Sequence, residues 1–251
     1  MVHINKQTEY FGLKNTEDIV MLNIRKQSGF TLVEIAIVLV IIGLLLGGIL
    51  KGQELINSAR VRNLADQNSG IQAAYYGFID RYRQVPGDWS ASAATTAIGV
   101  TVNLGGNGNG RIDNTLTEAA AAWEQLARSN FIGGGFEPAA GAIGSTADYV
   151  NAAPRNAFNG TLSLTRNSAY SGTNTDRLNL HLGNNIPVTI ARELDVKVDD
   201  GKPNKGILRL GAAAGSGGVF GTLHEIGSTC DDGTDYDIAG DGQDCGQVFL
   251  Y

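Results

Sequence analysis

The chain has 251 residues, enough for one or two domains with a sizeable buried core, which argues against a wholly disordered protein. Its 19 basic and 25 acidic residues give a formal net charge of −6, and no basic tract is present. A nucleic-acid partner is therefore not expected. Glycine is abundant at 34 residues and concentrates beyond residue 90, which indicates long surface loops rather than phosphate-binding turns.

The first predicted element is an apolar helix over residues 30–50. No residue from Ile35 to Leu50 is charged or polar. At about 1.5 Å of rise per residue the helix spans roughly 31 Å, close to the thickness of a bilayer's hydrocarbon core. Arg25 and Lys26 precede it, so the positive-inside rule places the N-terminus in the cytoplasm and the later residues outside. The sequence therefore predicts a single membrane span.

Three plainer explanations compete for this segment: a buried core helix, a cleaved secretory signal and a simple signal anchor. A core helix does not fit the length and uniformity of the stretch, and no small-x-small cleavage site follows Leu50. A simple anchor stays open, but it leaves Glu34 unexplained. An isolated carboxylate deep in a membrane helix costs on the order of 2.5–3.5 kcal/mol on insertion scales, so we expect Glu34 to have a partner.

The residues from Gly29 to Glu34 read Gly-Phe-Thr-Leu-Val-Glu and lead directly into the apolar stretch. This order resembles the cleavage and methylation signal of type IV prepilins and of the pseudopilins of type II secretion systems. The resemblance implies that a prepilin peptidase cuts between Gly29 and Phe30, that Phe30 becomes the N-methylated first residue, and that Glu34 is needed for assembly. It makes residues 1–29 a leader, although Met21 would start a more compact one.

The helical pattern continues beyond the apolar stretch. From Ile56 to Tyr82, apolar and aromatic residues recur near one stripe with charged residues between them. One helix over residues 30–83 is expected to stop before Pro86, which cannot continue it. Residues 30–50 would then face lipid and sister subunits, and the amphipathic residues 51–83 would pack on the chain's own domain. Many pilins carry a proline where this chain has Lys51.

The rest of the chain divides into a Gly-rich connecting region, residues 84–158, and a β-sheet region, residues 159–251. A short helix at about 118–129 is marked by a capping box of Thr115 and Glu118, and its Trp123 is expected to pack on the sheet.

Strand patterns follow at residues 161–165, 178–182, 206–210 and 247–251, and Asn159-Gly160 is typical of a hairpin turn. A helix first and strands afterwards indicate an α+β fold with an antiparallel sheet. The resemblance to type IV pilins implies the same fold: a long helix against a sheet, with a disulfide-closed loop at the end of the chain.

The two cysteines, Cys230 and Cys245, bracket a stretch so rich in Asp and Gly that it cannot bury itself. Either they are free thiols in a reducing compartment or they form a disulfide that tethers the stretch. The predicted membrane span decides between these alternatives, because it places everything after it outside the cytoplasm. We therefore expect a disulfide-closed loop over residues 230–245.

Calcium is considered at two places, and no cofactor is otherwise required. Asn107 and Asn109 have EF-hand spacing, but the first and twelfth positions of that loop are not acidic, so a glycine turn is preferred. The stretch between the cysteines carries six Asp residues, whose crowded charges favour neutralisation. Its candidate calcium ligands are Asp235, Asp237 and Asp241, against the alternative of a solvated acidic loop.

Catalytic chemistry is not indicated. His3, His181 and His224 lie far apart in the sequence, with His181 on the polar side of a predicted strand. No catalytic triad, zinc spacing or nucleophile context stands out, so no catalytic residue is assigned and the protein is not expected to be an enzyme.

The leading hypothesis is a structural subunit of a type IV pilus or related filament, polymerised through its N-terminal helix. The alternatives are a type II secretion pseudopilin or minor pilin acting as a binding module, and a membrane-anchored binding protein that never polymerises. The expected partners are copies of itself or other pilins, the prepilin peptidase and the inner-membrane assembly platform. The precursor would cross the inner membrane once, before joining an extracellular pilus or a periplasmic pseudopilus.

Overall fold

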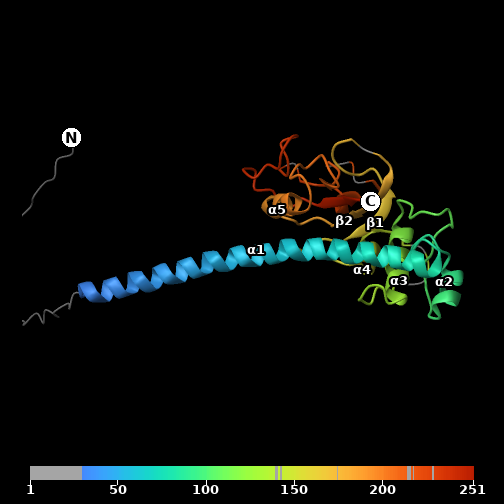
Figure 1. Cartoon of the computed structure of the whole chain (residues 1–251), viewed down its shortest axis with the longest axis horizontal. Helices are drawn as coiled ribbons and strands as arrows, with labels where there is room; N and C mark the ends of the chain where they lie inside the picture. Colours follow the sequence, from blue (N-terminus) through green and yellow to red (C-terminus); the bar gives the residue numbers. More distant parts are fainter. Residues whose placement is uncertain are drawn as a thin grey trace, which may run out of the picture. The chain divides into compact units, whose positions relative to one another are not determined.

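The computed structural model describes residues 30–138, 141, 143–173, 175–213, 216, 218–227 and 229–251. The predicted leader, with Met21 and Gly29, lies outside these residues. The chain forms two compact units, and the boundary between them lies between Ile49 and Leu50. The elements are α1 (Leu32–Tyr82), α2 (Ala91–Ile98), α3 (Leu116–Arg128), α4 (Thr146–Ala152), β1 (Ser163–Asn167), β2 (Arg177–His181), α5 (Val188–Val198), β3 (Leu208–Leu210), the 3-10 helix η1 (Gly218–Leu223) and β4 (Gln247–Leu250) (Figure 1).

Helix α1 is one continuous helix of 51 residues, as the sequence predicts. It ends at Tyr82, because Arg83 adopts a left-handed φ of 54° while its amide still donates to Ile79 O at 2.8 Å. Pro86 follows three residues later and cannot continue a helix.

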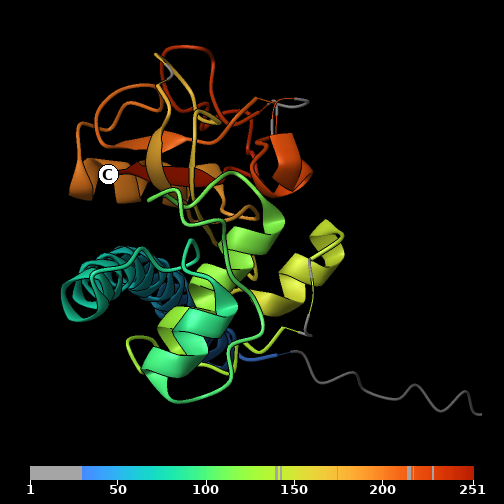
Figure 2. The same ribbon diagram turned by 90° about the vertical axis from the view of Figure 1, so that its right-hand side faces the viewer.

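The second unit contains a four-stranded antiparallel sheet in the order β1-β2-β4-β3. β1 and β2 pair from Ser163 opposite His181 to Asn167 opposite Arg177, and Phe249 of β4 lies opposite residues of both β2 and β3. Helices of residues 91–152 gather on one side of the strands (Figure 2). All four strands overlap the ranges predicted from the sequence, and the α+β class with an antiparallel sheet is confirmed.

One face of the sheet is apolar and packs on the long helix; we call it the inner face. Leu164, Leu180, Leu208 and Phe249 are opposite one another on it, and each is at most 2% exposed. Tyr251, on the same face of the chain as Phe249, donates its hydroxyl to Asn68 of α1 at 2.5 Å. The buried α1 residues that join this core are Val61, Leu64, Ile71, Ala74, Tyr75 and Phe78.

Helix α3 packs beside β1 and α4, and Trp123 provides the link. Its indole Nε1 donates to Tyr149 Oη of α4 at 2.9 Å, and that hydroxyl donates to Leu162 O, just before β1, at 2.8 Å. Both rings are fully buried, so each polar atom needs the partner it has. Trp123 thus packs in the core shared with the sheet, as predicted.

The start of α3 differs in detail from the predicted capping box. Thr115 Oγ1 accepts a bond from Glu118 N at 3.2 Å, which is half of the box. The Glu118 carboxylate does not return to the Thr115 amide; it accepts from Asp113 N at 2.7 Å. The Glu118 side chain therefore bonds to the backbone of the loop before α3 and fixes that loop to the helix.

The Asn159-Gly160 turn closes only an isolated bridge between Arg155 and Thr161. It was expected to lead into the first strand of a hairpin, and it does precede β1. The hairpin that pairs β1 with β2 is instead connected by the chain between Asn167 and Arg177.

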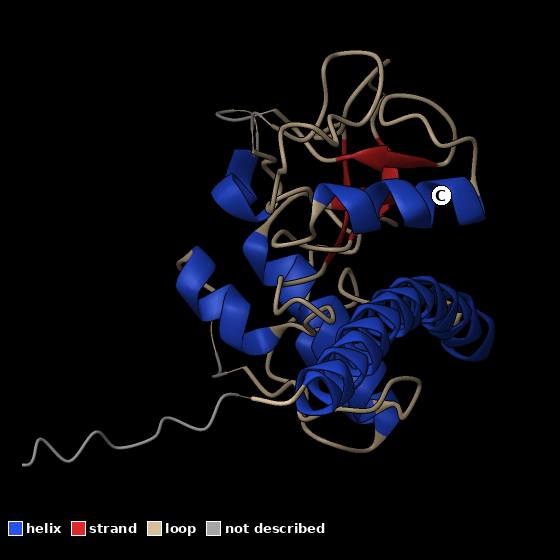
Figure 3. Cartoon of the chain, turned by 90° about the vertical axis from the view of Figure 1, so that its left-hand side faces the viewer, coloured by secondary structure: helices blue, strands red, loops and turns tan. Residues whose placement is uncertain are grey.

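The other face of β1 and β2, which we call the outer face, is polar yet buried. Ser163, Thr165, Asn167, Asn179 and His181 lie on it, and none is more than 5% exposed. The polar side of the strand at His181 is thus as predicted, but it does not meet solvent. Loops cover it (Figure 3), and its polar groups bond to one another; Asn179 Nδ2, for example, donates to Asn167 O at 3.0 Å.

Both edges of the sheet are partnered within the chain. At the β1 edge, Arg166 N donates to Ile112 O at 2.8 Å. At the β3 edge, Leu210 N donates to Pro203 O at 2.8 Å, and its carbonyl accepts from Ser171 N at 2.9 Å. Because these edge groups are occupied, they are not available for strand addition from another chain.

Candidate functional site

The N-terminal segment, residues 30–50, is the candidate site for processing and assembly. Every one of these residues is exposed in the single chain. Among the described residues α1 is the one helix long and apolar enough to cross a membrane, with a mean hydropathy of 2.8 over its most apolar 18 residues and none of that window buried. Large apolar patches of this kind are not left in water by soluble monomers, so lipid or another subunit has to cover the segment.

A capping box begins the helix at this segment. Thr31 precedes Leu32, the first helical residue, and its Oγ1 accepts from Glu34 N at 3.2 Å. In return Glu34 Oε2 accepts from Thr31 N at 2.7 Å and from the Thr31 hydroxyl at 2.9 Å. Two amides of the first turn are thereby satisfied.

Glu34 thus has hydrogen-bond donors in its own chain, whereas a charged partner for it stays a prediction. The sequence signal was the Thr-x-x-Glu pattern at Thr31 and Glu34, the same pattern that marks Thr115 and Glu118. Sequence reasoning used it for α3 and missed it here. Glu34 has two candidate roles as a result: capping its own helix, and pairing with the N-terminal amine that cleavage would create at Phe30.

Polar residues reappear at the end of the apolar segment. Lys51 Nζ lies 2.6 Å from Glu54 Oε2, and both side chains are exposed. Gly43, Gly47 and Gly48 interrupt the apolar residues before it, and a Cβ at any of them would meet no atom within 4 Å. These glycines therefore leave the surface open to close approach by another helix.

The second candidate site is the C-terminal loop closed by Cys230 and Cys245. The two sulfurs are bonded, as predicted, and their Cα atoms lie 5.5 Å apart. Both cysteines are fully buried. The bond ties the acidic loop to the chain just before β4.

A buried hydrogen-bond network holds the same loop to helix α5. Tyr236 Oη donates to Asp195 Oδ2 at 2.6 Å, and Gln247 Nε2 donates to Tyr236 Oη and to Ala191 O, each at 2.9 Å. Asp195 also accepts from Gly201 N at 3.1 Å. Burial raises the pKa of Asp195 to about 6, although the bonds from Tyr236 and Gly201 oppose that rise.

The three predicted calcium ligands are not gathered around a common point. Asp235 pairs with Lys202, Asp237 Oδ1 accepts from Gly240 N at 2.9 Å, and Asp241 Oδ1 accepts from Gln243 Nε2 at 3.0 Å. Each of the three carboxylates thus interacts with a different nearby residue. Calcium binding by this loop stays a prediction that the arrangement does not favour.

The acidic group that does come together among the described residues is Asp195, Asp199 and Asp200. Asp195 is held by Tyr236, while Asp199 Oδ2 accepts from Leu208 N at 3.0 Å and Asp200 Oδ1 accepts from Lys202 N at 2.9 Å. These bonds anchor the turn between α5 and β3, which is a structural role.

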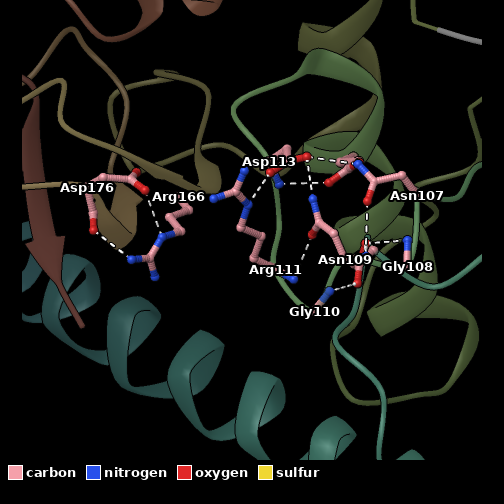
Figure 4. Close-up of polar contacts among 10 residues, drawn as sticks. Asn107, Gly108, Asn109, Gly110, Arg111, Asp113, Arg166 and Asp176 are labelled. Atoms are coloured by element: carbon pink, nitrogen blue, oxygen red, sulfur yellow. Dashed lines mark hydrogen bonds and ion pairs between the residues drawn. The ribbon is translucent and has the colours of Figure 1, made fainter.

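The backbone amides of the glycine-rich turn that has EF-hand spacing donate to a carboxylate of the same chain (Figure 4). The Asp88 carboxylate accepts from the amides of Gly108, Asn109 and Gly110 at 2.7–3.0 Å. Asn107 and Asn109 each donate their side-chain amide to Asp113 Oδ2 at 2.8 Å. The side-chain oxygens of Asn107 and Asn109 accept from backbone amides of the same turn, so this geometry agrees with the glycine turn preferred from the sequence.

Two of the histidines meet, which the sequence did not indicate. The His181 and His224 rings are stacked with centroids 3.5 Å apart, and His224 Nε2 bonds to Ser163 Oγ. Neither ring is more than 2% exposed, and Ser163 is 1% exposed. The Ser–His pair is therefore shut off from solvent in this arrangement.

The fold and the site together define a class. A long N-terminal helix whose later part packs on a four-stranded antiparallel sheet, with a disulfide near the C-terminus, is consistent with the α+β pilin fold.

Comparison with known proteins bears on the N-terminal segment. Residues 24–50 match the family described as the prokaryotic N-terminal methylation motif. No curated protein and no solved structure matches the chain. The matched residues include Gly29, Phe30 and Glu34, so the chain carries a type IV pilin-like prepilin signal.

Proposed function

We propose that this protein is a structural subunit of a type IV pilus or a related filament. On this proposal a prepilin peptidase removes residues 1–29, Phe30 is N-methylated, and residues 30–50 hold the subunit in the inner membrane until assembly. The apolar helix then exchanges lipid for the equivalent helices of neighbouring subunits, while the second unit is displayed outside the cytoplasm.

The observation that carries the proposal is the match at residues 24–50, together with the exposure of every residue from 30 to 50. Two further observations support it. Backbone groups at both edges of the sheet bond within the chain, which disfavours polymerisation by strand addition. The disulfide agrees with a domain that matures in an oxidising compartment outside the cytoplasm.

Glu34 is the residue on which assembly depends in this proposal. Its carboxylate accepts from Thr31 in the single chain, and cleavage would add an amine one residue earlier, at Phe30. Inside an apolar helix bundle, opposite charges attract far more strongly than in water, and a carboxylate left alone is costly in proportion. The Glu34–amine pair, within one subunit or between neighbours, would therefore set the register of the helices.

The experiment replaces Glu34 with Val and measures processing and sheared filaments separately. We expect near-normal cleavage with few or no filaments in a strain where this is the major subunit. Glu54→Gln is the matched control, because Glu54 is an exposed carboxylate of the same helix paired with Lys51. Wild-type filament yield from Glu34→Val would overturn the assembly role.

Thr31→Val separates the two roles of Glu34. It removes the hydroxyl of the cap but leaves the Glu34 carboxylate and the Phe30 amine in place. We expect it to retain filaments. Loss of filaments equal to that of Glu34→Val would mean that Glu34 acts only as a helix cap.

A further inference from the structure

A short stretch of chain, residues 218–226, lies over the part of the outer face that carries Ser163 and His181, and we call it the cover. Its His224 ring lies between two others: His181 of β2 at 3.5 Å and Phe220 of η1 at 4.3 Å between centroids. Phe220 in turn contacts Tyr149 of α4 edge-on at 5.0 Å. A column of stacked rings thus contributes to holding the cover on the sheet.

Polar bonds to this column are few. His224 Nε2 bonds to Ser163 Oγ, and His181 Nε2 lies 3.5 Å from Asn167 Oδ1. His224 Nδ1 is buried and has no hydrogen-bond partner among the described residues. The backbone of the cover is tied near its end, where Ala212 N donates to His224 O and Ile226 N donates to Ala212 O, each at 2.9 Å.

Among the described residues, the groups that bond to the two rings are a hydroxyl and an amide oxygen rather than carboxylates. On the elements packed around them, Arg166 of β1 pairs with Asp176, Arg177 of β2 is exposed, Asp148 of α4 accepts from Ser145, and η1 carries no charged residue. Glu225 follows His224 in the chain. Burial lowers the pKa of His181 to about 3, and burial together with His181 lowers the pKa of His224.

We propose that the His181–His224 stack is an acid-sensitive latch that holds the cover on the sheet at neutral pH and releases it when the rings are protonated. A proton on either imidazole places a charge in an enclosed site with a second imidazole 3.5 Å away. The charge is accommodated when the rings reach water, and that requires the cover to lift.

A cavity already lies beside the cover. Its volume is about 600 Å³, and Asn167, Tyr170, Ala212 and Gly218 are among its lining residues. Lifting the cover would widen this cavity over the polar outer face. The latch does not depend on filament assembly, so it stands or falls separately from the proposed function.

Hydrogen exchange of the full chain in detergent micelles tests the latch between pH 7.5 and pH 5, after correction for the intrinsic pH dependence of exchange. In the open cover each imidazole would titrate near its ordinary pKa of about 6.5, whereas in the closed cover it stays neutral. The opening constant should therefore rise at pH 5 by about 30-fold for one histidine and about 1,000-fold for both. Helix α3 should keep its protection.

The double variant His181→Asn with His224→Gln should make protection of the cover independent of pH, and Glu225→Gln should leave the wild-type dependence intact. If the double variant does not fold, the ring nitrogens of the wild type are followed by NMR. Rings that titrate near pH 6.5 under a still-protected cover would overturn the proposal. Equal loss of protection in α3 and in the cover would overturn it too, because that is global unfolding.

Discussion

The two parts of helix α1 share one backbone conformation but differ in where their packing comes from. Residues 30–50 are apolar and exposed throughout, whereas the later part contributes six buried side chains to the core of the second unit. The later part is stabilised by its own chain. The earlier part has no such packing in the single chain, so its apolar surface needs lipid or other subunits to cover it.

The largest effect that separates the two parts is expected from matched leucines. Leu64→Ala removes a side chain with 0% exposure from the core and should lower the free energy of unfolding by about 2–5 kcal/mol. Leu44 is 72% exposed, so Leu44→Ala should leave that free energy unchanged. Denaturant unfolding of the full chain in detergent, followed by the fluorescence of Trp89 and Trp123, measures both.

The comparison would break in either of two ways. A Leu44→Ala variant as unstable as Leu64→Ala would mean that the apolar segment packs on its own domain. A Leu64→Ala variant with wild-type stability would mean that the later part of α1 does not belong to the core.

The next effect concerns the C-terminal loop. Replacing both Cys230 and Cys245 by Ser should lower stability by roughly 3 kcal/mol, because the unfolded chain is no longer constrained. Thiol labelling of the native wild type without reductant should modify neither cysteine. Quantitative labelling of both cysteines would contradict the disulfide between Cys230 and Cys245.

A smaller, pH-dependent effect is expected at Asp195. Its pKa of about 6 exceeds its ordinary value of 3.8, so the folded protein binds the proton more tightly than the unfolded chain does. The resulting stabilisation is fully present below about pH 4 and is lost as pH rises through about 6.

Asp195→Asn should remove this dependence, so the stability difference between wild type and variant should shift in favour of the variant from pH 4 to pH 7. Thermal unfolding at a series of pH values measures it. Tyr236→Phe, which removes the hydroxyl bonded to Asp195, is expected to destabilise the loop at neutral pH by about 1–3 kcal/mol. If the stability difference between wild type and Asp195→Asn did not change with pH, the pKa of Asp195 would not be raised in the folded protein.

Features with strong local signals could be predicted from the sequence. The apolar run and Pro86 bounded α1, and Thr115 marked the start of α3. Alternating Leu residues placed β2, and the predicted ranges of all four strands lie within two residues of their observed limits. Helix α4 begins with Ser145 as its N-cap, whose Oγ accepts from Asp148 N at 3.2 Å. The Ser-x-x-Asp pattern in the sequence could have predicted this helix start but was not used.

Features that depend on long-range contact could not be predicted. Helix α2 is composed mostly of Ala, Ser and Thr and shows no apolar stripe, although Ala94 is fully buried. Helix α5 has a usable pattern in Ile190, Ala191 and Leu194, but it lies among loop-like residues. The burial of the polar outer face, and the meeting of His181 with His224, depend on a segment 43 residues away in sequence (224 minus 181).

The central claim is that the chain is a prepilin cut directly before Phe30. Intact-mass analysis of the protein from membranes or sheared filaments tests it most directly. The account predicts a mature chain of 222 residues (251 minus 29) that begins with N-methylated Phe30 and contains one disulfide. A mature form that retains residues 21–29, or an unmodified Phe30 in assembled filaments, would contradict it.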